Sequence, residues 1–171
     1  MLYSKILKGL REQTTLKGGI RFQLDIEDWI PSCLYFSGEY EAGEIDFMQN
    51  SLSEGDVLID IGANIGLYTL YGAKAVGKSG SVFAFEPFSL NYDNLIKNIS
   101  INHFSNIIVE KKAVSDNSTP INIYYDKNEK NSGMASSYLT EYSHEEQVES
   151  ITLDQYLEDK SLNKINFIKI D

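Results

Sequence analysis

The sequence is short of the residues that build disulfide frameworks and metal centres. Its 171 residues include one cysteine, Cys33, and two histidines, His103 and His144. A single cysteine excludes an internal disulfide, and the chain offers no metal-ligand spacing around it. We therefore expect no metal site, and the reducing cytoplasm suits such a chain. Both histidines stand in polar surroundings, where we expect them to be solvated rather than to act as bases.

Long apolar runs and an excess of positive charge are also missing. No stretch reaches the roughly 18 apolar residues that would span a bilayer. Lys5 and Lys8 interrupt the apolar N-terminus, so it lacks a secretory segment, and we read the glycosylation patterns at Asn98 and Asn117 as chance matches. Fifteen basic and 25 acidic residues give a formal net charge of −10. This charge argues against nucleic-acid and membrane partners, because no basic patch offsets it.

The most informative stretch is Val57–Tyr71, which predicts a strand, a glycine loop and a helix. Its first residues are too continuously apolar for a half-exposed strand and suit a parallel sheet that is covered on both faces. Asp60 stands near the carboxyl end of this strand, where open α/β sheets bind their ligands. Gly62 and Gly66 allow a sharp turn and a close approach of a ligand to the backbone, and the start of the helix suits an anionic group.

The spacing of these glycines differs from that of a dinucleotide-binding loop. A Gly-x-Gly-x-x-Gly fingerprint would place a glycine where Asn64 stands, whereas this chain has Gly-x-x-x-Gly after an acid. Residues 81–87 then read Ser-Val-Phe-Ala-Phe-Glu-Pro, a second buried strand that ends in Glu86, one βαβ unit downstream. A carboxylate at this position can accept hydrogen bonds from both hydroxyls of a ribose. The two motifs together are more specific than either alone.

The remaining pattern predicts an α/β domain at 38–171 behind a small N-terminal extension at 1–37. In the extension, residues 1–18 are expected to form a short helix and a polar turn, and 20–26 and 29–36 an antiparallel hairpin. Alternating units after residue 38 indicate right-handed βαβ connections. The expected helices are 38–52, 67–75, 91–101 and 153–157 (N-cap Thr152), and the core strands are 57–61, 82–85, 107–114 and 166–170. Two antiparallel strands, 120–125 and 148–152, are expected around a polar loop at 126–147.

These blocks, taken in order, resemble the FkbM family of class I S-adenosylmethionine-dependent methyltransferases. The resemblance extends from about Gly38 to Asp171. It rests on Gly38-Glu-Tyr-Glu41, Asp60-Ile-Gly-Ala-Asn-Ile-Gly66, Ala84-Phe-Glu-Pro87 with Asn91, Ala113-Val-Ser-Asp116, Thr152-Leu-Asp154 and Phe167-Ile-Lys-Ile-Asp171. It implies a doubly wound, Rossmann-like and mainly parallel sheet, with S-adenosyl-L-methionine as cofactor. It also implies methylation of a hydroxyl on a sugar or a secondary metabolite.

The resemblance assigns cofactor-binding roles to residues at the ends of the strands. Asp60 is expected to anchor the methionine end of the cofactor, with backbone groups of Gly62, Asn64 and Gly66 around it. Glu86 is expected to accept the ribose hydroxyls. The other expected contacts are Pro87 or Phe88 on the adenine face, Ser115 and Asp116 at the adenine edge, and Tyr40 and Glu41 as a cap.

Asp171 is the candidate catalytic residue, because it closes a strand beside the glycine loop and can face the methyl-transfer site. The acceptor is expected to be a small-molecule or glycan hydroxyl. Methyl transfer is an in-line displacement, so orientation of the acceptor oxygen and desolvation of the sulfonium can provide most of the catalysis, with modest base assistance to remove the hydroxyl proton.

The chain differs from the family pattern where it stops. Family members continue past the last aspartate with Val-Glu-Gly and several further strands, whereas this sequence stops at Asp171. The stop leaves 167–170 as an apolar, unpaired sheet edge, which natural proteins avoid. We therefore expect a fragment or a truncated reading frame that lacks the C-terminal strands. If these residues are the whole chain, we expect self-association through the open edge or instability, with little or no methyl transfer.

Two other functions stay open on the sequence alone. A nicotinamide- or nucleotide-binding oxidoreductase would need the missing middle glycine, and Glu86-Pro87 is atypical for that class. A non-catalytic remnant that acts as an interaction module is favoured only by the early end of the chain. A thermal-shift comparison of S-adenosylhomocysteine with NAD would separate the methyltransferase from the oxidoreductase.

Overall fold

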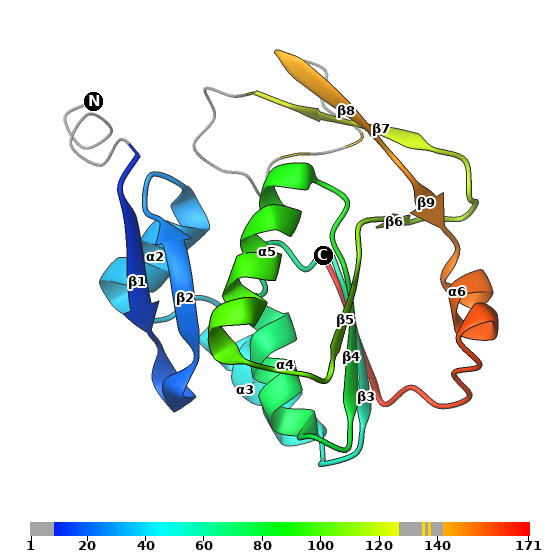
Figure 1. Ribbon diagram of the computed structural model, residues 1–171, viewed down its shortest axis with the longest axis horizontal. Helices are drawn as coiled ribbons and strands as arrows, with labels where there is room; N and C mark the ends of the chain where they lie inside the picture. The colour runs from blue at the N-terminus through cyan, green and yellow to red at the C-terminus, as the bar shows by residue number, and fades with distance from the viewer. Residues whose placement is uncertain (1–8, 127–134, 136, 138–141) are drawn as a thin grey trace.

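The main sheet of the protein is parallel and lies at the centre of the fold. The computed structural model describes residues 9–126, 135, 137 and 142–171. Its sheet has the order β10-β3-β4-β5, formed by Phe167–Ile170, Val57–Ile61, Ser81–Phe85 and Ile107–Glu110 (Figure 1). Every neighbouring pair is parallel. This arrangement confirms the predicted α/β, doubly wound sheet.

Helices cover both faces of this sheet. On one face, α4 (Leu67–Val76) and α5 (Ser89–Asn102) connect successive strands, and α3 (Ala42–Ser51) packs beside α4. The opposite face is covered by α6 (Leu153–Asp159), whose Tyr156 packs against Phe83 and Phe85 (Figure 1). Thr152 accepts a hydrogen bond from the Gln155 amide (3.2 Å), which confirms it as the N-cap of α6.

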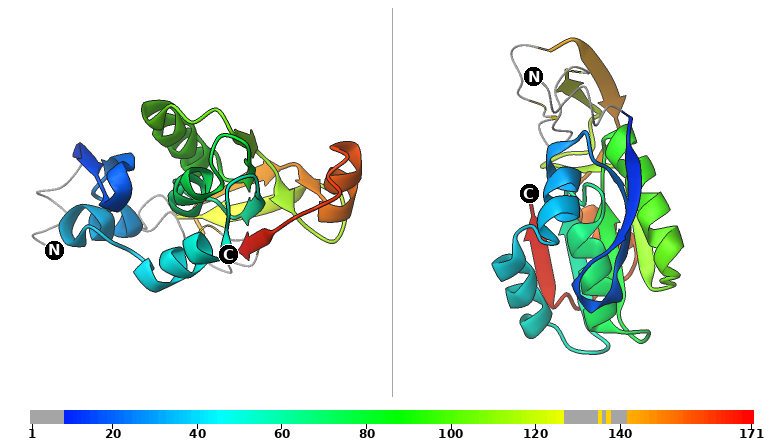
Figure 2. Two further views of the ribbon diagram at one scale, coloured as in Figure 1. Left: turned by 90° about the horizontal axis from the view of Figure 1, so that it is seen from below. Right: turned by 90° about the vertical axis from the view of Figure 1, so that its left-hand side faces the viewer.

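The order of the strands creates a topological switch point between β3 and β10. From β3 the chain moves outward through β4 and β5, and it then returns by way of α6 to the other side of β3. Ligands of open α/β sheets bind at such points, outside the carboxyl ends of the strands. Figure 2 shows β10 beside α3, where the rings of Phe47 and Phe167 are in contact. β10 is the outer strand of the described sheet, and self-association through it stays a prediction.

The N-terminal extension differs from its prediction. The hairpin consists of β1 (Arg11–Thr15) and β2 (Arg21–Asp25) around a 3-10 turn, η1 (Lys17–Gly19). The predicted polar turn is therefore confirmed at residues 17–19, whereas the helix predicted before it is wrong for residues 9–16. Residues 29–36, predicted as a strand, belong instead to the helix α2 (Trp29–Ser37). Pro31 lies in its first turn, where a missing N–H costs no intrahelical hydrogen bond. Residues 1–8 lie outside the described residues.

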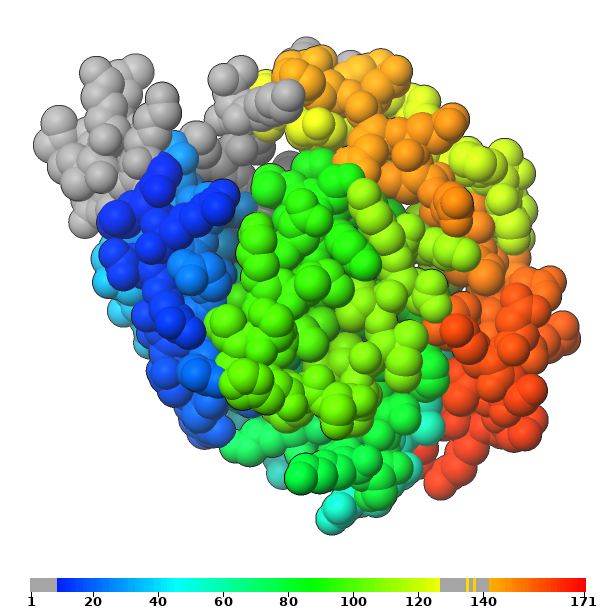
Figure 3. Space-filling model, in the orientation of Figure 1, coloured from blue at the N-terminus to red at the C-terminus, as the bar shows by residue number. Residues whose placement is uncertain are grey.

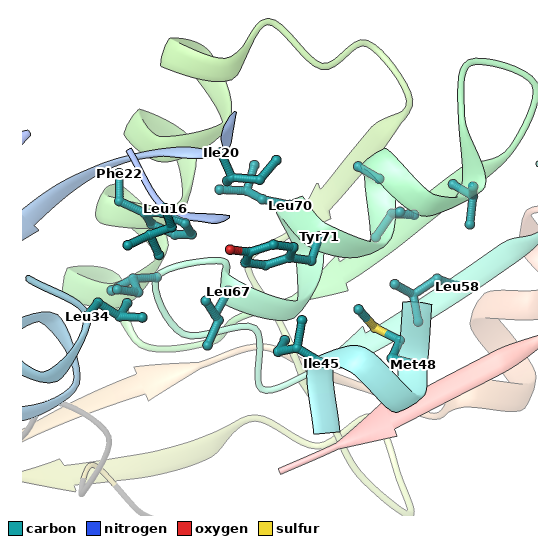
Figure 4. Close-up of a cluster of buried hydrophobic side chains, with 14 of the residues drawn as sticks. Leu16, Ile20, Phe22, Leu34, Ile45, Met48, Leu58, Leu67, Leu70 and Tyr71 are labelled. Atoms are coloured by element: carbon teal, nitrogen blue, oxygen red, sulfur yellow. The ribbon is translucent and has the colours of Figure 1, made fainter. Parts of the chain in front are cut away.

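The hairpin, α2, α3 and α4 share one hydrophobic core with the sheet. Tyr71 of α4 lies near its middle, and its hydroxyl donates a hydrogen bond to the Lys17 carbonyl at 2.9 Å. Figure 4 shows the cluster around this ring, formed by Leu16, Ile20, Phe22, Leu34, Ile45, Met48, Leu58, Leu67 and Leu70. The extension is therefore packed as part of the domain core rather than as a separate unit.

Two asparagines of α5 attach the hairpin to the domain. Asn98 is fully buried; it accepts a hydrogen bond from the Gln23 amide (2.8 Å) and donates one to the Ile65 carbonyl (2.9 Å). Asn102 accepts from the Arg21 amide (2.8 Å) and donates to the Arg21 carbonyl (2.6 Å). Figure 3 shows the hairpin, in blue, packed against α5, in green. Because Asn98 is buried, the folded chain does not present it for glycosylation.

The region after β5 also corrects the sequence prediction. The strand expected at 107–114 is broken after Glu110, and β6 (Ala113–Val114) leaves the main sheet to pair in parallel with β9 (Ser150–Ile151). β7 (Ile121–Tyr125) pairs antiparallel with β8 (His144–Val148), so most of the predicted partner strand 148–152 is misplaced. Residues 144–147, predicted as loop, alternate between half-buried and exposed as a strand does. The rest of the predicted loop lies largely outside the described residues.

The described helices give no sign of a membrane span: none combines the length and the apolar character needed to cross a bilayer. The described residues likewise contain no group of three or more histidine, cysteine, aspartate or glutamate side chains that is arranged to hold a metal ion.

Candidate functional site

The candidate site lies where β3, β4 and β10 end, at the switch point of the sheet. Its first component is the glycine loop, which follows β3. The amides of Gly62 and Ala63 both donate to the Phe85 carbonyl, at 3.0 and 2.9 Å, so the loop is fixed to the end of β4. The φ angle of Gly62 is +75°, and a Cβ at this position would lie 3.2 Å from the Asp171 Cβ. A side chain at position 62 would therefore strain the backbone and press on β10.

Gly66 has a packing role in addition to the one that the ligand motif implies. Its φ is +98°, and an added Cβ would lie 2.6 Å from Leu95 Cδ1 of α5. This glycine therefore lets two helices of the same face approach each other. Its role near the cofactor stays a prediction, whereas its role in packing follows directly from these distances.

Asn64 takes the left-handed conformation that a glycine would adopt more easily. Its φ is +52°, and asparagine is among the few residues that tolerate this region. The backbone amide of Asn64 donates a 2.7 Å hydrogen bond to Glu86 Oε2. Its side-chain Oδ1 is buried and has no hydrogen-bond partner among the described residues. The loop therefore presents an unsatisfied acceptor, which is rare in folded proteins.

Glu86 is held by backbone groups at the end of β4. It is 4 % exposed; one carboxylate oxygen accepts from the Asn64 amide and the other from the Phe88 amide at 3.0 Å. Burial raises the pKa of Glu86 to about 7, although the two amides oppose the shift. Each carboxylate oxygen can accept a further hydrogen bond, so these contacts leave capacity for a ligand.

Asp60 takes its contacts from Thr69 and Lys169. It is fully buried, and Thr69 Oγ1 of α4 donates to its Oδ2 at 2.5 Å. Its Oδ1 has no hydrogen bond among the described residues, and the nearest cation is Lys169 Nζ, 3.8 Å away. Burial raises the pKa of Asp60, while Lys169 and Thr69 act to lower it.

The ammonium of Lys169, a residue to which the sequence motifs assign no role, lies between several site residues. It donates to the Gly62 carbonyl at 3.1 Å and lies 3.3 Å from Asp171 Oδ2. The ring of Tyr68 lies 4.8 Å from it. Lys169 is the parallel neighbour of Asp60 in the register of β10 and β3. The available signal was a lysine inside an apolar strand, two residues before the candidate catalytic aspartate.

Tyr40 and Glu41 lie next to this group, at the start of α3. The Tyr68 hydroxyl donates to Glu41 at 2.8 Å, and burial together with Glu41 raises the pKa of Tyr40. Glu41 itself has a left-handed backbone, with φ of +50°. A groove beside them, between α3 and β10, is lined by Glu41, Gly43, Glu44, Phe47, Tyr68 and residues 167–171.

The side chains of the remaining predicted residues have other neighbours, although the Phe88 backbone amide contacts Glu86. Phe88 is buried among Ala113, Ile123 and Val148, and its ring contacts Tyr125 with centroids 4.8 Å apart. Pro87 is half-buried before α5. Ser115 and Asp116 follow β6, outside the main sheet, and hydrogen-bond to each other at 3.2 Å. The adenine contacts assigned to these residues stay predictions.

Comparison with known proteins decides the family. A family profile described as the methyltransferase FkbM domain matches residues 60–171, which include Asp60, Glu86 and Lys169. The chain belongs to the FkbM methyltransferase family. This result confirms the resemblance and makes S-adenosylmethionine the cofactor of its class. It also decides against the oxidoreductase alternative.

Several solved structures are similar to parts of this chain. TYW2 from M. jannaschii, solved with AdoMet, is 26% identical with a TM-score of 0.46, and the match covers 60% of this chain and 43% of that one. TYW2 from P. horikoshii, solved with MeSAdo, is 16% identical with a TM-score of 0.48, and the match covers 66% of this chain and 46% of that one. Trm5b from Pyrococcus abyssi is 24% identical with a TM-score of 0.45, and the match covers 58% of this chain and 27% of that one. The match spans less than half of each solved protein. No curated protein matches the sequence.

The residues of the FkbM site fit the cofactor of the family. Buried acceptor atoms without hydrogen bonds, Asp60 Oδ1 and Asn64 Oδ1, lie at the glycine loop, where a cationic or hydrogen-donating group would satisfy them. Glu86 adds a carboxylate at the end of the next strand, with acceptor capacity for two hydroxyls. This set of hydrogen-bond acceptors therefore suits a ligand that carries both an amino group and a ribose.

Proposed function

We propose that this FkbM chain binds S-adenosylmethionine at the glycine loop and methylates a hydroxyl of a small molecule or glycan. The observation that supports this proposal best is the buried Oδ1 of Asp60 at the switch point of the sheet, which has no hydrogen-bond partner in the described part of the chain. A fully buried acceptor of this kind is costly unless a ligand or water satisfies it. The amino group of a methionine moiety is a donor of the required kind.

The proposed cofactor contacts divide between two strands. Asp60 at β3 binds the methionine end, and backbone groups of Gly62, Asn64 and Gly66 surround it. Glu86 at β4 accepts the ribose hydroxyls in addition to its two backbone amides. Pro87 or Phe88, Ser115 with Asp116, and Tyr40 with Glu41 are the proposed adenine and cap contacts. When bound, S-adenosylmethionine supplies an electrophilic methyl group on a sulfonium.

The acceptor is proposed to enter along the groove between α3 and β10. Asp171 opens onto this groove, with 73 % of its side chain exposed, and it lies against Gly62. It can therefore accept the proton of a hydroxyl placed there, while Lys169, 3.3 Å away, holds its orientation. The carboxylates of Glu41 and Glu44 and the ring of Phe47 offer hydrogen-bond acceptors and an apolar face to a hydroxylated acceptor.

Calorimetry with S-adenosylhomocysteine and NAD tests the cofactor half of this proposal. We expect S-adenosylhomocysteine to bind and NAD not to bind, and Asp60→Asn to weaken the former. Asp93→Asn, at an exposed position on α5, is the matched control and should have no effect. Binding of NAD alone would overturn the proposal.

Transfer of a labelled methyl group to a panel of sugars and hydroxylated metabolites tests the acceptor half. We expect incorporation into a hydroxyl, and Asp171→Asn should lower it while S-adenosylhomocysteine affinity stays within a few-fold. Incorporation only into nitrogen or carbon acceptors would contradict O-methylation.

A further inference from the structure

The ammonium of Lys169, which orients Asp171 in the proposed function, also contacts the cofactor side of the site. It lies on the opposite side of the switch point from the β4 contacts, and its side chain is 13 % exposed. Its neighbours come from every element around it. They are the Gly62 carbonyl of the loop, Asp60 of β3, Asp171 directly after β10 and the ring of Tyr68 of α4.

We propose that Lys169 is a positioning residue of the cofactor site, which keeps Asp60 charged and ties the glycine loop to β10. The inference rests on the proposed function, because the group that Asp60 would bind is the methionine end of the cofactor. Lys169 acts through Asp60 and Gly62 and need not touch the ligand.

The distances show how one ammonium serves both purposes. At 3.1 Å, the contact with the Gly62 carbonyl is a hydrogen bond, which fixes the loop at its first glycine. At 3.8 Å, the contact with Asp60 Oδ1 is an ion pair but too long for a hydrogen bond. Lys169 therefore stabilises the charge on Asp60 without occupying the hydrogen-bonding capacity of that oxygen.

Burial explains why Asp60 needs this neighbour. A fully buried carboxylate without a cation nearby takes up a proton instead of staying charged. Among the described residues, Lys169 is the only ion-pair partner of Asp60. The other titratable groups that face the pair are Asp171, Glu86, Glu41, Glu44, Tyr40 and Tyr68. All six are carboxylic acids or phenols, so none of them can replace the positive charge of Lys169.

A neutral side chain of similar length separates charge from packing. Lys169→Met should weaken S-adenosylhomocysteine binding at pH 7 by about tenfold or more, because Asp60 becomes protonated. The loss should shrink as the pH rises, and the midpoint of the affinity profile should move upward by about one pH unit or more. Lys169→Arg should stay within about threefold of the wild type, since it keeps the charge. Lys164→Met, at an exposed position before β10, is the matched control.

A double-mutant cycle with Asp60→Asn distinguishes positioning from simple packing. If Lys169 acts through the Asp60 charge, Lys169→Met should change affinity by less than about twofold in the Asp60→Asn background. The neutral double variant should also have a higher Tm than Lys169→Met at pH 7, because folding does not have to protonate a buried carboxylate at position 60. Additive losses in affinity with an unchanged pH profile would overturn the proposal.

The same variants stay informative if Lys169→Met does not fold. In that case, recovery of a cooperative melting transition in the double variant supports the proposal, and failure to recover contradicts it. If the wild type binds no S-adenosylhomocysteine, the proposed function fails, while the coupling between Asp60 and Lys169 is still measured by the Tm values of the cycle.

Discussion

The two sides of the glycine loop hold their carboxylates in different ways. On the β4 side, Glu86 is 4 % exposed and both of its oxygens accept backbone amides. On the β10 side, Asp60 depends on Thr69 and Lys169, and the adjoining Asp171 is largely exposed. Backbone donors are fixed by the fold, whereas side-chain partners can be changed by a single substitution. The β4 side is therefore suited to constant recognition of a cofactor, and the β10 side to a site whose charge can be adjusted.

The largest expected effect comes from a substitution that damages both sides. Gly62→Val should reduce S-adenosylhomocysteine affinity by about 100-fold or more. A β-branched residue is strained at φ +75°, and its Cβ would meet Asp171. Calorimetry measures the loss, and circular dichroism checks that the protein stays folded. Gly43→Ala is the control, since nothing lies within 4 Å of its added Cβ. Normal binding by the valine variant would make the loop purely structural.

A smaller effect should follow when the β4 side alone is removed. Glu86→Ala should weaken S-adenosylhomocysteine binding by at least ~1.5 kcal/mol, about tenfold, because charge-assisted hydrogen bonds to two hydroxyls are lost. Glu145→Ala, at an exposed position on β8, should leave the titration unchanged. Equal affinities for wild type and Glu86→Ala would end the ribose assignment.

The raised pKa of Glu86 predicts opposite pH trends for affinity and stability. Burial raises this pKa from 4.5 to about 7 in the free protein. Ribose hydroxyls donate to the ionised carboxylate, so affinity should rise with pH and level off above about 7. Between these two values the folded state binds more protons than the unfolded state, so the contribution of Glu86 to stability should fall as pH rises. Calorimetry and chemical denaturation from pH 5 to 8 measure both trends.

Glu86→Gln provides the control for these trends. It should flatten both of them, apart from the part that belongs to Asp60, whose pKa is also raised. A wild-type affinity that does not change over this pH range would contradict the assignment.

A substitution confined to the β10 side should have the smallest measurable effect. Tyr68→Phe removes the 2.8 Å hydrogen bond to Glu41 but keeps the ring beside Lys169. We expect a loss of about 0.5–1.5 kcal/mol in the free energy of unfolding and unchanged S-adenosylhomocysteine affinity. Urea denaturation gives the first value and calorimetry the second. A large loss of cofactor affinity would place the hydroxyl of Tyr68 in the binding site.

We expect the protein not to bind nucleic acid. A net charge of −10 gives the chain no electrostatic attraction to phosphate backbones. Fluorescence anisotropy with RNA and DNA oligonucleotides should show no binding at low salt. Tight binding that weakens as salt increases would contradict this expectation.

The sequence was sufficient for the elements that carry a strong local pattern. Continuous apolar runs identified β3 and β4, and the acid at the end of each run located Asp60 and Glu86. The extension was predicted poorly, because the apolar residues around Pro31 fit a strand or the first turn of a helix equally well. The sequence does not predict the break after Glu110, because residues 107–114 fit the pattern of one continuous strand.

The partners of the carboxylates could not be predicted from the sequence. Lys169 follows Asp60 by more than a hundred residues, and only the register of β10 against β3 makes them neighbours. The same holds for Asn64: its sequence context suggested a missing glycine, but the structure shows that asparagine keeps the left-handed φ of that position. Such relations depend on strand order and backbone angle, which local composition does not determine.

The two hydrogen bonds of Asn98 have a consequence for local unfolding. This side chain joins the Gln23 amide of β2 to the Ile65 carbonyl of the glycine loop, through the middle of α5. Separating the hairpin from the helix would leave a buried amide group without one of its partners and would release one constraint on the loop. The amides of β2 and of the loop should therefore exchange with solvent as one cooperative unit. Cleavage of the chain within the hairpin should then also destabilise the glycine loop, although the two segments lie far apart in the sequence.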